Sequence, residues 1–439
     1  MNADSTPVHR MIMPPAPYTL EETGLAFDTL LQMVTKILHL AGEQRGADLA
    51  QRLGVRYAVI EPVLHHLRST YLCEVSGGGL VGGPSFVYRI TDAGRSRAML
   101  FLEQSRYVGR APVPFRQYEE YMRRFDREIE RGVTRSRVQQ GFAHLVLSDR
   151  VLDQLGPAVS GGHSLFVYGP PGNGKTVIAQ GIKNLLDGDI AIPYAIDYDG
   201  HVLQVHDPVV HESRPEFASS DLDSGDVPDH RWLRCRRPLV TVGGELVMSS
   251  LDLAFDQVSG FYRAPIQLAA NGGVLVIDDF GRQRCSVVDL LNRWITPLES
   301  RTDYLTLTSG QKLPMPFIVL VVLATNIKPA DLVDEAFLRR IHYKVFAENP
   351  TVADFKQIFM RCCRDKGVAY DDGLVDALVT RYFRRRGIAL RGCHPRDVID
   401  HALALADYLD QPRVLTERLL VSACDSYFLD EQTAAPLPA

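Results

Sequence analysis

Short apolar runs alternate with amphipathic segments through the middle of this 439-residue chain. Residues 165–168 form an apolar run that leads through a glycine-rich turn into residues 177–186, where apolar side chains recur at helical spacing. Further strand-like runs follow at 190–196, 272–280 and 317–325. Strands that alternate with helices predict an α/β fold whose parallel sheet is covered on both faces.

A different pattern occupies residues 20–105 and predicts a separate α+β domain behind a flexible N-terminus at 1–19. Apolar periodicity predicts helices at 22–40, 46–53, 57–71 and 92–104, the last capped by Thr91, and strands at 72–75 and 86–90. The order helix, helix-turn-helix, hairpin, helix is that of a winged helix.

The predicted third helix, 57–71, would be the reading helix if this domain bound DNA. Contacts with phosphates need cations. That helix carries Arg68 and two histidines but also the negatively charged Glu61, and the glycine-rich loop at 76–85 contains no Lys or Arg. We therefore favour protein docking or self-association for this domain and keep DNA binding as the alternative.

Residues 106–140 are expected to form a linker. Nine arginines between Arg106 and Arg137 alternate with acidic residues, a pattern that predicts a solvated helix. Pro112 and Pro114 should break the chain ahead of that helix.

The glycine-rich turn carries the strongest chemical signal. Glycines at 169, 172 and 174 allow the backbone amides to point at one polyphosphate. Lys175 would reach the β- and γ-phosphates, while the Thr176 hydroxyl would hold Mg²⁺. The predicted nucleotide-binding residues are Gly169, Pro170, Pro171, Gly172, Asn173, Gly174, Lys175, Thr176 and Val177.

Polar side chains end two of the other predicted strands. Asp278 and Asp279 follow one apolar run, and Asn326 follows the next. Carboxylates beside a phosphate loop suit Mg²⁺ and its water. We assign Asp278 to the metal, Asp279 to polarising the attacking water and Asn326 to orienting that water.

Together these motifs resemble those of AAA+ ATPases. GPPGNGKT matches the Walker A motif, VLVIDD the Walker B motif and LATN sensor 1. The resemblance predicts a nucleotide-binding core at 141–348, a helical lid at 349–430 and a short flexible tail at 431–439. Within the superfamily, residues 260–274 and 303–314 resemble the pre-Walker B stretch and pre-sensor hairpin of MoxR-like, chelatase, MCM and enhancer-binding activator ATPases.

The same resemblance implies that active sites form between subunits of a homo-oligomeric ring, a hexamer by analogy. Residues 335–341 are similar to the segment that carries the arginine finger, and both Arg339 and Arg340 fit that role. Residues 392–397 resemble sensor 2, which would make Arg396 a further catalytic residue. The implied ligands are ATP and Mg²⁺.

One residue departs from the family pattern. The Walker B motif usually ends in Asp-Glu, where this chain has Asp278 and Asp279. The second carboxylate therefore falls short by about 1.5 Å, one carbon–carbon bond. Because a misplacement of about 1 Å can cost on the order of a hundredfold in rate, the enzyme is either slow or uses nucleotide mainly as a switch.

An insertion is expected at about 198–262, because the gap between the second run and the Walker B motif exceeds a bare connection. It should contain a hairpin turn at 198–201 and an acidic mobile stretch at 219–229. Phe261 and Tyr262 either grip a substrate in the pore of the ring or pack internally. We favour a polar surface loop over a metal site for His206, Asp207, His211 and Glu212.

Cysteine content, net charge and hydropathy indicate the compartment and the kind of partner to expect. Seven scattered cysteines form no CxxC pair, which suits free thiols in a reducing compartment, and the net charge of -5 does not favour a polyanion partner. With neither a signal sequence nor an apolar run long enough to cross a bilayer, we expect a soluble cytoplasmic protein without a membrane partner. The leading hypothesis is an ATPase that remodels a protein client, with the N-terminal domain as recruiter. The alternatives are a DNA-associated regulator or loader and a slow nucleotide-gated scaffold.

Overall fold

The computed structural model describes residues 13–78, 82–128, 132–162, 164–186, 188–214, 227–332 and 338–428. The chain divides into two compact units. Unit 1 comprises Met1–Arg131, Leu186–Val276 and Gln283–Val321, and unit 2 comprises Gly132–Leu185, Ile277–Arg282 and Val322–Ala439. The domain boundaries inferred from the sequence stay predictions. Four segments named from the sequence lie wholly or partly outside the described residues. They are the termini at 1–19 and 431–439, the glycine-rich loop at 76–85 and the acidic stretch at 219–229.

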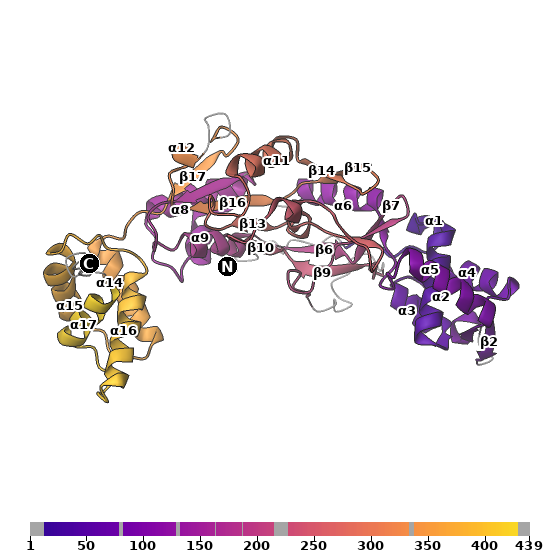
Figure 1. Ribbon diagram of the computed structural model, residues 1–439, viewed down its shortest axis with the longest axis horizontal. Coiled ribbons are helices and arrows are strands. Elements are labelled where there is room, and N and C mark those ends of the chain that lie inside the picture. Colours follow the sequence, from indigo (N-terminus) through magenta and orange to yellow (C-terminus); the bar gives the residue numbers. More distant parts are fainter. Residues whose placement is uncertain are drawn as a thin grey trace, which may run out of the picture. The chain divides into compact units, whose positions relative to one another are not determined.

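Unit 1 begins with five helices and a small antiparallel sheet (Figure 1). The helices are α1 (Leu20–Thr23), α2 (Phe27–Ala41), α3 (Gly46–Leu53), α4 (Tyr57–Ser69) and α5 (Asp92–Gln104). The sheet has the order β1-β3-β2 and consists of β1 (Gln44–Arg45), β2 (Cys73–Gly77) and β3 (Val87–Ile90). The predicted helices at 46–53 and 92–104 are confirmed, as is the Thr91 cap, whose side chain accepts from the Gly94 amide.

The single helix predicted at 22–40 is wrong. Gly24 adopts a left-handed conformation with φ of 68° and ends α1, and its amide donates to the Glu21 carbonyl. Ala26 is extended, so α2 begins only at Phe27. The apolar periodicity continues across this break because Leu25 is itself buried, which hid the break from a pattern of hydrophobic positions.

The predicted linker contains a helix that is only half solvated. On α6 (Phe115–Glu128), arginines and glutamates form exposed or partly exposed i,i+4 ion pairs, while Tyr118, Tyr121, Met122 and Phe125 are buried. As expected, Pro112 and Pro114 lie ahead of this helix, which begins at Phe115. Val113 and Pro114 form β4, which pairs in parallel with β7 (Ala195–Tyr198). The helix therefore belongs to the core of unit 1.

The run at 190–196 was expected to be a strand of the parallel sheet, and this expectation is wrong for β6 (Asp189–Pro193). Instead of joining the main sheet, it pairs antiparallel with β9 (Trp232–Arg236). A separate sheet has the order β11-β12-β8-β7-β4, with β8 (His201–Gln204), β11 (Ala254–Asp256) and β12 (Phe261–Arg263). The predicted turn at 198–201 is confirmed, because Tyr198 pairs with His201 across two residues with positive φ.

Two open alternatives in this region are decided by burial. Tyr262 is buried and its hydroxyl lies 2.6 Å from the Thr308 hydroxyl, so it packs internally, while half-buried Phe261 contacts Tyr107 edge to face. The expected polar surface loop is wrong for His211, which is buried and has its two ring nitrogens within hydrogen-bonding distance of the Asp207 amide and the Ala269 carbonyl. The predicted hairpin at 303–314 is present as β14 (Thr302–Thr306) and β15 (Lys312–Pro316).

The main sheet has the order β10-β13-β16-β5-β17 and confirms the α/β class. Its strands are β10 (Leu239–Val242), β13 (Val274–Ile277), β16 (Leu320–Thr325), β5 (Leu165–Tyr168) and β17 (Tyr343–Phe346), and β5 pairs in parallel with both β16 and β17. All residues of β16 are buried, as expected for a strand covered on both faces. Strand β10 lies inside the predicted insertion, so that segment contributes to the main sheet.

Six further helices and two 3₁₀ turns lie between α6 and the C-terminal helices among the described residues. They are α7 (Arg135–Gly141), α8 (Asp149–Gly161), α9 (Lys175–Gly181), α10 (Ile266–Ala269), α11 (Val287–Ser300) and α12 (Pro329–Leu332), with 3₁₀ turns at Ile182–Leu185 and Met248–Leu251. No helix within the described ranges has both the length and the apolar character needed to span a bilayer.

The C-terminal part of unit 2 is a helical bundle. It contains α14 (Val352–Asp365), α15 (Asp372–Ala377), α16 (His394–Tyr408) and α17 (Glu417–Tyr427) around a shared core (Figure 1). Thr351 and Asp354 form a capping box that starts α14. Helix α15 continues beyond Ala377 as a π-helical turn, Leu378–Arg384. We call this bundle the lid.

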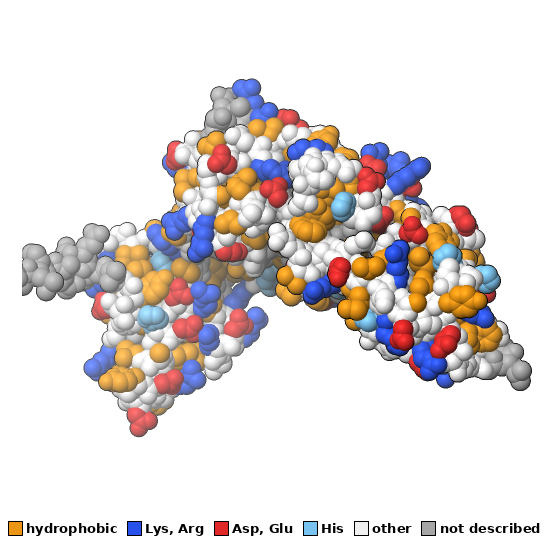
Figure 2. Space-filling view, turned by 45° about the vertical axis from the view of Figure 1, so that its right-hand side comes forward, with side chains coloured by type: hydrophobic (Ala, Val, Ile, Leu, Met, Phe, Trp, Pro, Cys, Tyr) orange, Lys and Arg blue, Asp and Glu red, His pale blue; other side chains and the backbone are white. Residues whose placement is uncertain are grey.

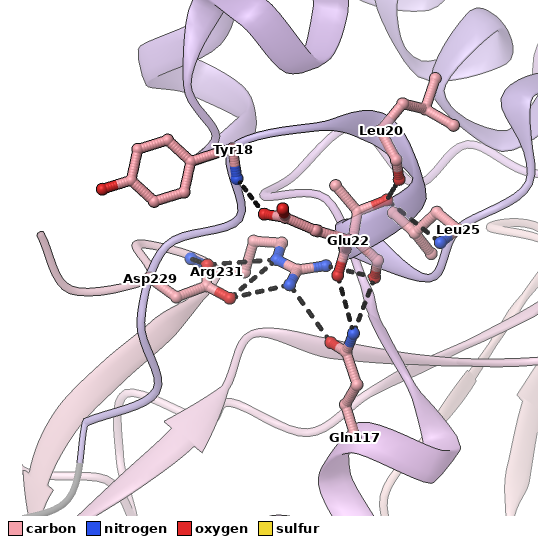
Figure 3. A network of polar contacts seen from close by, with 8 residues as sticks. Tyr18, Leu20, Glu22, Leu25, Gln117, Asp229 and Arg231 are labelled. Atoms are coloured by element: carbon pink, nitrogen blue, oxygen red, sulfur yellow. Dashed lines mark hydrogen bonds and ion pairs between the residues drawn. The ribbon is translucent and has the colours of Figure 1, made fainter. Parts of the chain in front are cut away.

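A buried ion pair ties the start of unit 1 together (Figure 3). Arg231 and Asp229 are each 2% exposed and lie 2.8 Å apart. Arg231 also donates to the Thr23 carbonyl and to Oε1 of Gln117. Nε2 of Gln117 donates to the carbonyls of Glu22 and Thr23. Three segments separated by more than 90 residues therefore share one polar network.

We expect Arg231→Ala to lower the free energy of unfolding by about 3–5 kcal/mol, because it leaves the Asp229 carboxylate buried without its partner. Arg116→Ala on α6 is the matched control, since its ion pair with Glu120 is exposed on both sides and such pairs contribute about 0.3–0.5 kcal/mol. Calorimetric unfolding measures both variants. Equal effects would contradict a stabilising role for the buried network.

Candidate nucleotide-binding site

The glycine-rich turn adopts the conformation that its sequence predicts. It leaves β5 at Tyr168 and enters α9 at Lys175, and Gly169, Gly172 and Gly174 all have positive φ, from 71° to 146°. A Cβ added at Gly169 would overlap the carbonyl oxygen of Ala347. Glycine is therefore required there both by backbone conformation and by the close approach of another segment.

Lys175 is held inside this turn. The residue is 7% exposed, and its Nζ donates to the Pro170 carbonyl at 2.8 Å. Burial lowers the pKa of Lys175, and the nearby carboxylates of Asp279 and Asp278 partly oppose that shift. A cation in this position, bonded to a single carbonyl, can exchange that bond for a phosphate oxygen.

The residues predicted to hold the metal lie in direct contact. The Thr176 hydroxyl donates to Oδ2 of Asp278 at 2.7 Å, which brings the start of α9 to the end of β13. A hydroxyl and a carboxylate beside a phosphate loop are the oxygen ligands that Mg²⁺ takes in such sites. The residues present therefore fit a bound Mg²⁺ ion.

The side chains of Asp279 and Asn326 are also adjacent. Nδ2 of Asn326 donates to Oδ1 of Asp279 at 3.2 Å. Asp279 has a left-handed backbone with φ of 47°, and its amide donates to Oδ1 of Asp278. Around this turn, the Phe280 amide donates to the Ala324 carbonyl and the Thr325 hydroxyl donates to the Phe280 carbonyl, which fixes the two strand ends against each other.

These groups line one cavity of about 500 Å³, within the range of ligand pockets. Of the predicted residues, those at 171–177 line it together with Asp278, Asp279, Asn326 and Arg396. Gly169 and Pro170 form the back of the turn. No motif in the sequence pointed to the rest of the lining, which comes from the segment before α8 and from α14 of the lid. Its apolar part, called here the apolar wall, consists of Leu145, Val146, Leu147, Ile358 and Cys362, and the same segments add the polar residues His144, Arg361 and Asp365.

The predicted arginines differ in placement. Arg396 is at the cavity, with its side chain 65% exposed and two of its nitrogens 3.0 Å from Oδ1 of Asp397. Arg339 is exposed and Arg340 half-buried, and neither lines the cavity of its own chain among the described residues. The first three residues of the predicted finger segment, 335–337, lie outside the described residues.

The sheet order, the phosphate loop and the carboxylates at the end of β13 define the core as that of an AAA+ P-loop ATPase. A family model described as magnesium chelatase, subunit ChlI, matches residues 148–190, which include the loop. A second model, a domain of unknown function (DUF8689), matches residues 351–426 of the lid. A search of curated proteins found no significant match.

Solved structures similar to this chain include the RuvB Holliday junction branch migration motor of Thermotoga maritima, 15% identical, which covers 64% of this chain and 69% of its own with a TM-score of 0.36. NtrX from Brucella abortus is 10% identical, and the match covers 79% of this chain and 62% of the NtrX chain with a TM-score of 0.37. These scores are low, so the assignment to the class rests on the motifs, the site and the family match.

Substitution of Gly172 should distort the loop. A Cβ there would lie 2.6 Å from Sγ of Cys393 on a backbone with φ of 82°, so Gly172→Ala should destabilise unit 2 by about 2–4 kcal/mol. Gly174→Ala is the matched control, because its Cβ would meet open space and only the left-handed cost of about 1–2 kcal/mol applies. Thermal unfolding measures both, and Gly172→Ala combined with Cys393→Ala should recover the difference. Equal losses in the two single variants would contradict the close contact.

Proposed function

We propose that the protein binds MgATP in this cavity and hydrolyses it. The observation that carries the proposal is the convergence of Lys175, the Thr176–Asp278 contact and the Asp279–Asn326 pair on one cavity large enough for a nucleotide. A chance arrangement would not combine a cationic group, a metal-binding pair and a water-binding pair at the ends of adjacent strands.

Each side chain then has a role. The loop amides and Lys175 bind the β- and γ-phosphates, and Thr176 and Asp278 hold Mg²⁺. When bound, Mg²⁺ neutralises charge on the phosphate oxygens. Asp279 accepts a proton from the attacking water, and Asn326 fixes the direction of that carboxylate through the 3.2 Å hydrogen bond.

The apolar wall suits the base of the nucleotide. Leu145, Val146 and Leu147 face the cavity from one side, and Ile358 and Cys362 from α14 of the lid. Flat aromatic ligands are favoured in such walls because they exclude water from apolar side chains. Binding of the base would therefore involve both the core and the lid of unit 2.

The ring-shaped homo-oligomer, a hexamer by resemblance, is part of the proposal. Because Arg339 and Arg340 lie outside the lining of the cavity in their own chain, either of them would reach the transferred phosphoryl group only from a neighbouring subunit. Arg396, on the lid, would act from within the same chain after release from Asp397.

We further propose that turnover remodels a protein client recruited by the N-terminal helices. Arg89, on the strand next to the glycine-rich loop, pairs with Glu74 and Glu43, so this cation is already neutralised. On the face shown in Figure 2, Lys and Arg side chains are interspersed with Asp and Glu side chains. Both observations favour a protein partner over the phosphate backbone of DNA.

Two substitutions separate binding from chemistry. Lys175→Ala should lower ATP hydrolysis by about a hundredfold or more, because the phosphates lose their cation. Asp279→Asn should still bind MgATP but hydrolyse it at least about a hundredfold more slowly, because the proton acceptor is lost. Phosphate release measures turnover, and nucleotide binding is measured in parallel. Hydrolysis that is unchanged by Lys175→Ala would overturn the enzymatic proposal, and no turnover in the wild-type protein would favour the nucleotide-gated scaffold.

The stalled Asp279→Asn variant should retain its partner. We expect ATP-dependent capture of a protein that Lys175→Ala does not capture, because only the first variant holds the triphosphate state. Retention on duplex DNA is measured at increasing salt as the competing outcome. Nucleotide-dependent DNA retention that falls steeply with salt, without a captured protein, would favour the DNA-associated regulator instead.

A further inference from the structure

Asn173 lies in the phosphate loop, but its side chain makes its hydrogen bonds with other segments. The residue is 9% exposed. Its Nδ2 donates to Oδ1 of Asn349 at 2.8 Å and to the Ala347 carbonyl at 3.3 Å, and its Oδ1 accepts from the Gly392 amide at 3.2 Å. We call these four residues the Asn173 clamp.

The chemistry of the partners fixes the orientation of the Asn173 amide. A backbone amide such as that of Gly392 can only donate, and a carbonyl such as that of Ala347 can only accept. Exchanging the oxygen and nitrogen of Asn173 would therefore break both bonds. The contact is directional, and aspartate, which cannot donate when ionised, would not replace asparagine at this position.

The clamp joins the phosphate loop to the lid. Ala347 and Asn349 follow β17 on the way to α14, and Gly392 precedes α16. A second bond runs in parallel, from the Cys393 amide to the Gly172 carbonyl at 2.8 Å. Two consecutive loop residues, 172 and 173, therefore hold two consecutive lid residues, 392 and 393.

We propose that Asn173 is a positioning residue that couples the conformation of the phosphate loop to the position of the lid. This inference rests on the proposed function, since it assigns a regulatory role within the same site. A ligand shifts a conformational equilibrium only by its differential affinity for the two states. Because residues 171–177 line the cavity and the Asn173 side chain bonds to the lid, phosphates bound by the loop change the stability of the clamp and thereby of lid placement.

The strength of the clamp sets the expected effect. Asn173→Ala removes two donor bonds and leaves the Gly392 amide without its acceptor, so opening of the lid loop should become about tenfold more frequent. The same loss should weaken MgADP binding by a similar factor, because by linkage a ligand that stabilises the clamp gains from it.

Hydrogen exchange of the peptide that spans residues 390–395 tests the proposal, because it contains both amides that bond to the loop. In the full-length protein without nucleotide, Asn173→Ala should speed exchange of this peptide about tenfold, the factor that follows from the lost bonds. In the wild-type protein, MgADP should slow this exchange, and the variant should lose that protection at saturating MgADP. Tyr408→Ala, at the exposed end of α16, is the control expected to behave like the wild type.

Changes at Asn349 test the clamp without altering the loop sequence. Asn349→Ala should speed exchange, whereas Asn349→Asp keeps an acceptor for Nδ2 of Asn173 and should restore slow exchange. Asn173→Ala with Asn349→Ala should exchange no faster than Asn173→Ala alone.

Exchange in Asn173→Ala that equals that of the wild type, with and without MgADP, would overturn the inference. If the wild-type protein binds no MgADP, the proposed function fails, while exchange without nucleotide still decides whether Asn173 holds the lid. The two failures are therefore distinguishable.

Discussion

The site depends on the parallel pairing of β5 between β16 and β17. Their registers place Tyr168 beside both Thr325 and Phe346, so the residues that follow each strand emerge at one edge of the sheet. From there the phosphate loop, the sensor amide of Asn326 and the start of the lid connection must share the same space. The hydrogen bond from the Ala347 amide to the Tyr168 carbonyl and the overlap that any Cβ at Gly169 would produce show how closely these segments approach. The functional side chains at this edge of the sheet come from several segments. Their proximity therefore depends on the register of the strands that precede them.

Hydrogen bonds then fix the relative positions of these side chains. Thr176 and Asp278 join α9 to the end of β13, and Asn326 and Asp279 join two strand ends. The left-handed backbone of Asp279 gives a physical reason for the aspartate where related motifs have glutamate, since aspartate and asparagine tolerate this conformation better than longer side chains do. The turn thus places the shorter carboxylate within reach of the sensor amide. Hydrogen bonds join distant segments in unit 1 as well, because buried Arg231 bonds to neighbouring Asp229 and to two distant residues, Thr23 and Gln117.

The sequence alone could predict the phosphate loop, the residues at the strand ends and most helices, because each depends on local spacing or on strand polarity. Three features depended on tertiary context instead. Gly24 breaks a helix whose apolar periodicity continues through buried Leu25. Strand β6 has the apolar pattern of a main-sheet strand but pairs with β9. The wall formed by Leu145 and Ile358 carries no motif, because ordinary apolar side chains from distant segments meet there only after folding. The arginines assigned to neighbouring subunits stay predictions, since their role requires a second copy of the chain.

Magnesium dependence of ATP binding, measured by calorimetric titration of the wild-type protein with and without a chelator, tests the central claim most directly. If Thr176 and Asp278 hold the metal and Lys175 binds the phosphates, one MgATP should bind per chain and the affinity should fall markedly when magnesium is removed. Absence of ATP binding, or binding with the same affinity in the presence of the chelator, would contradict the account.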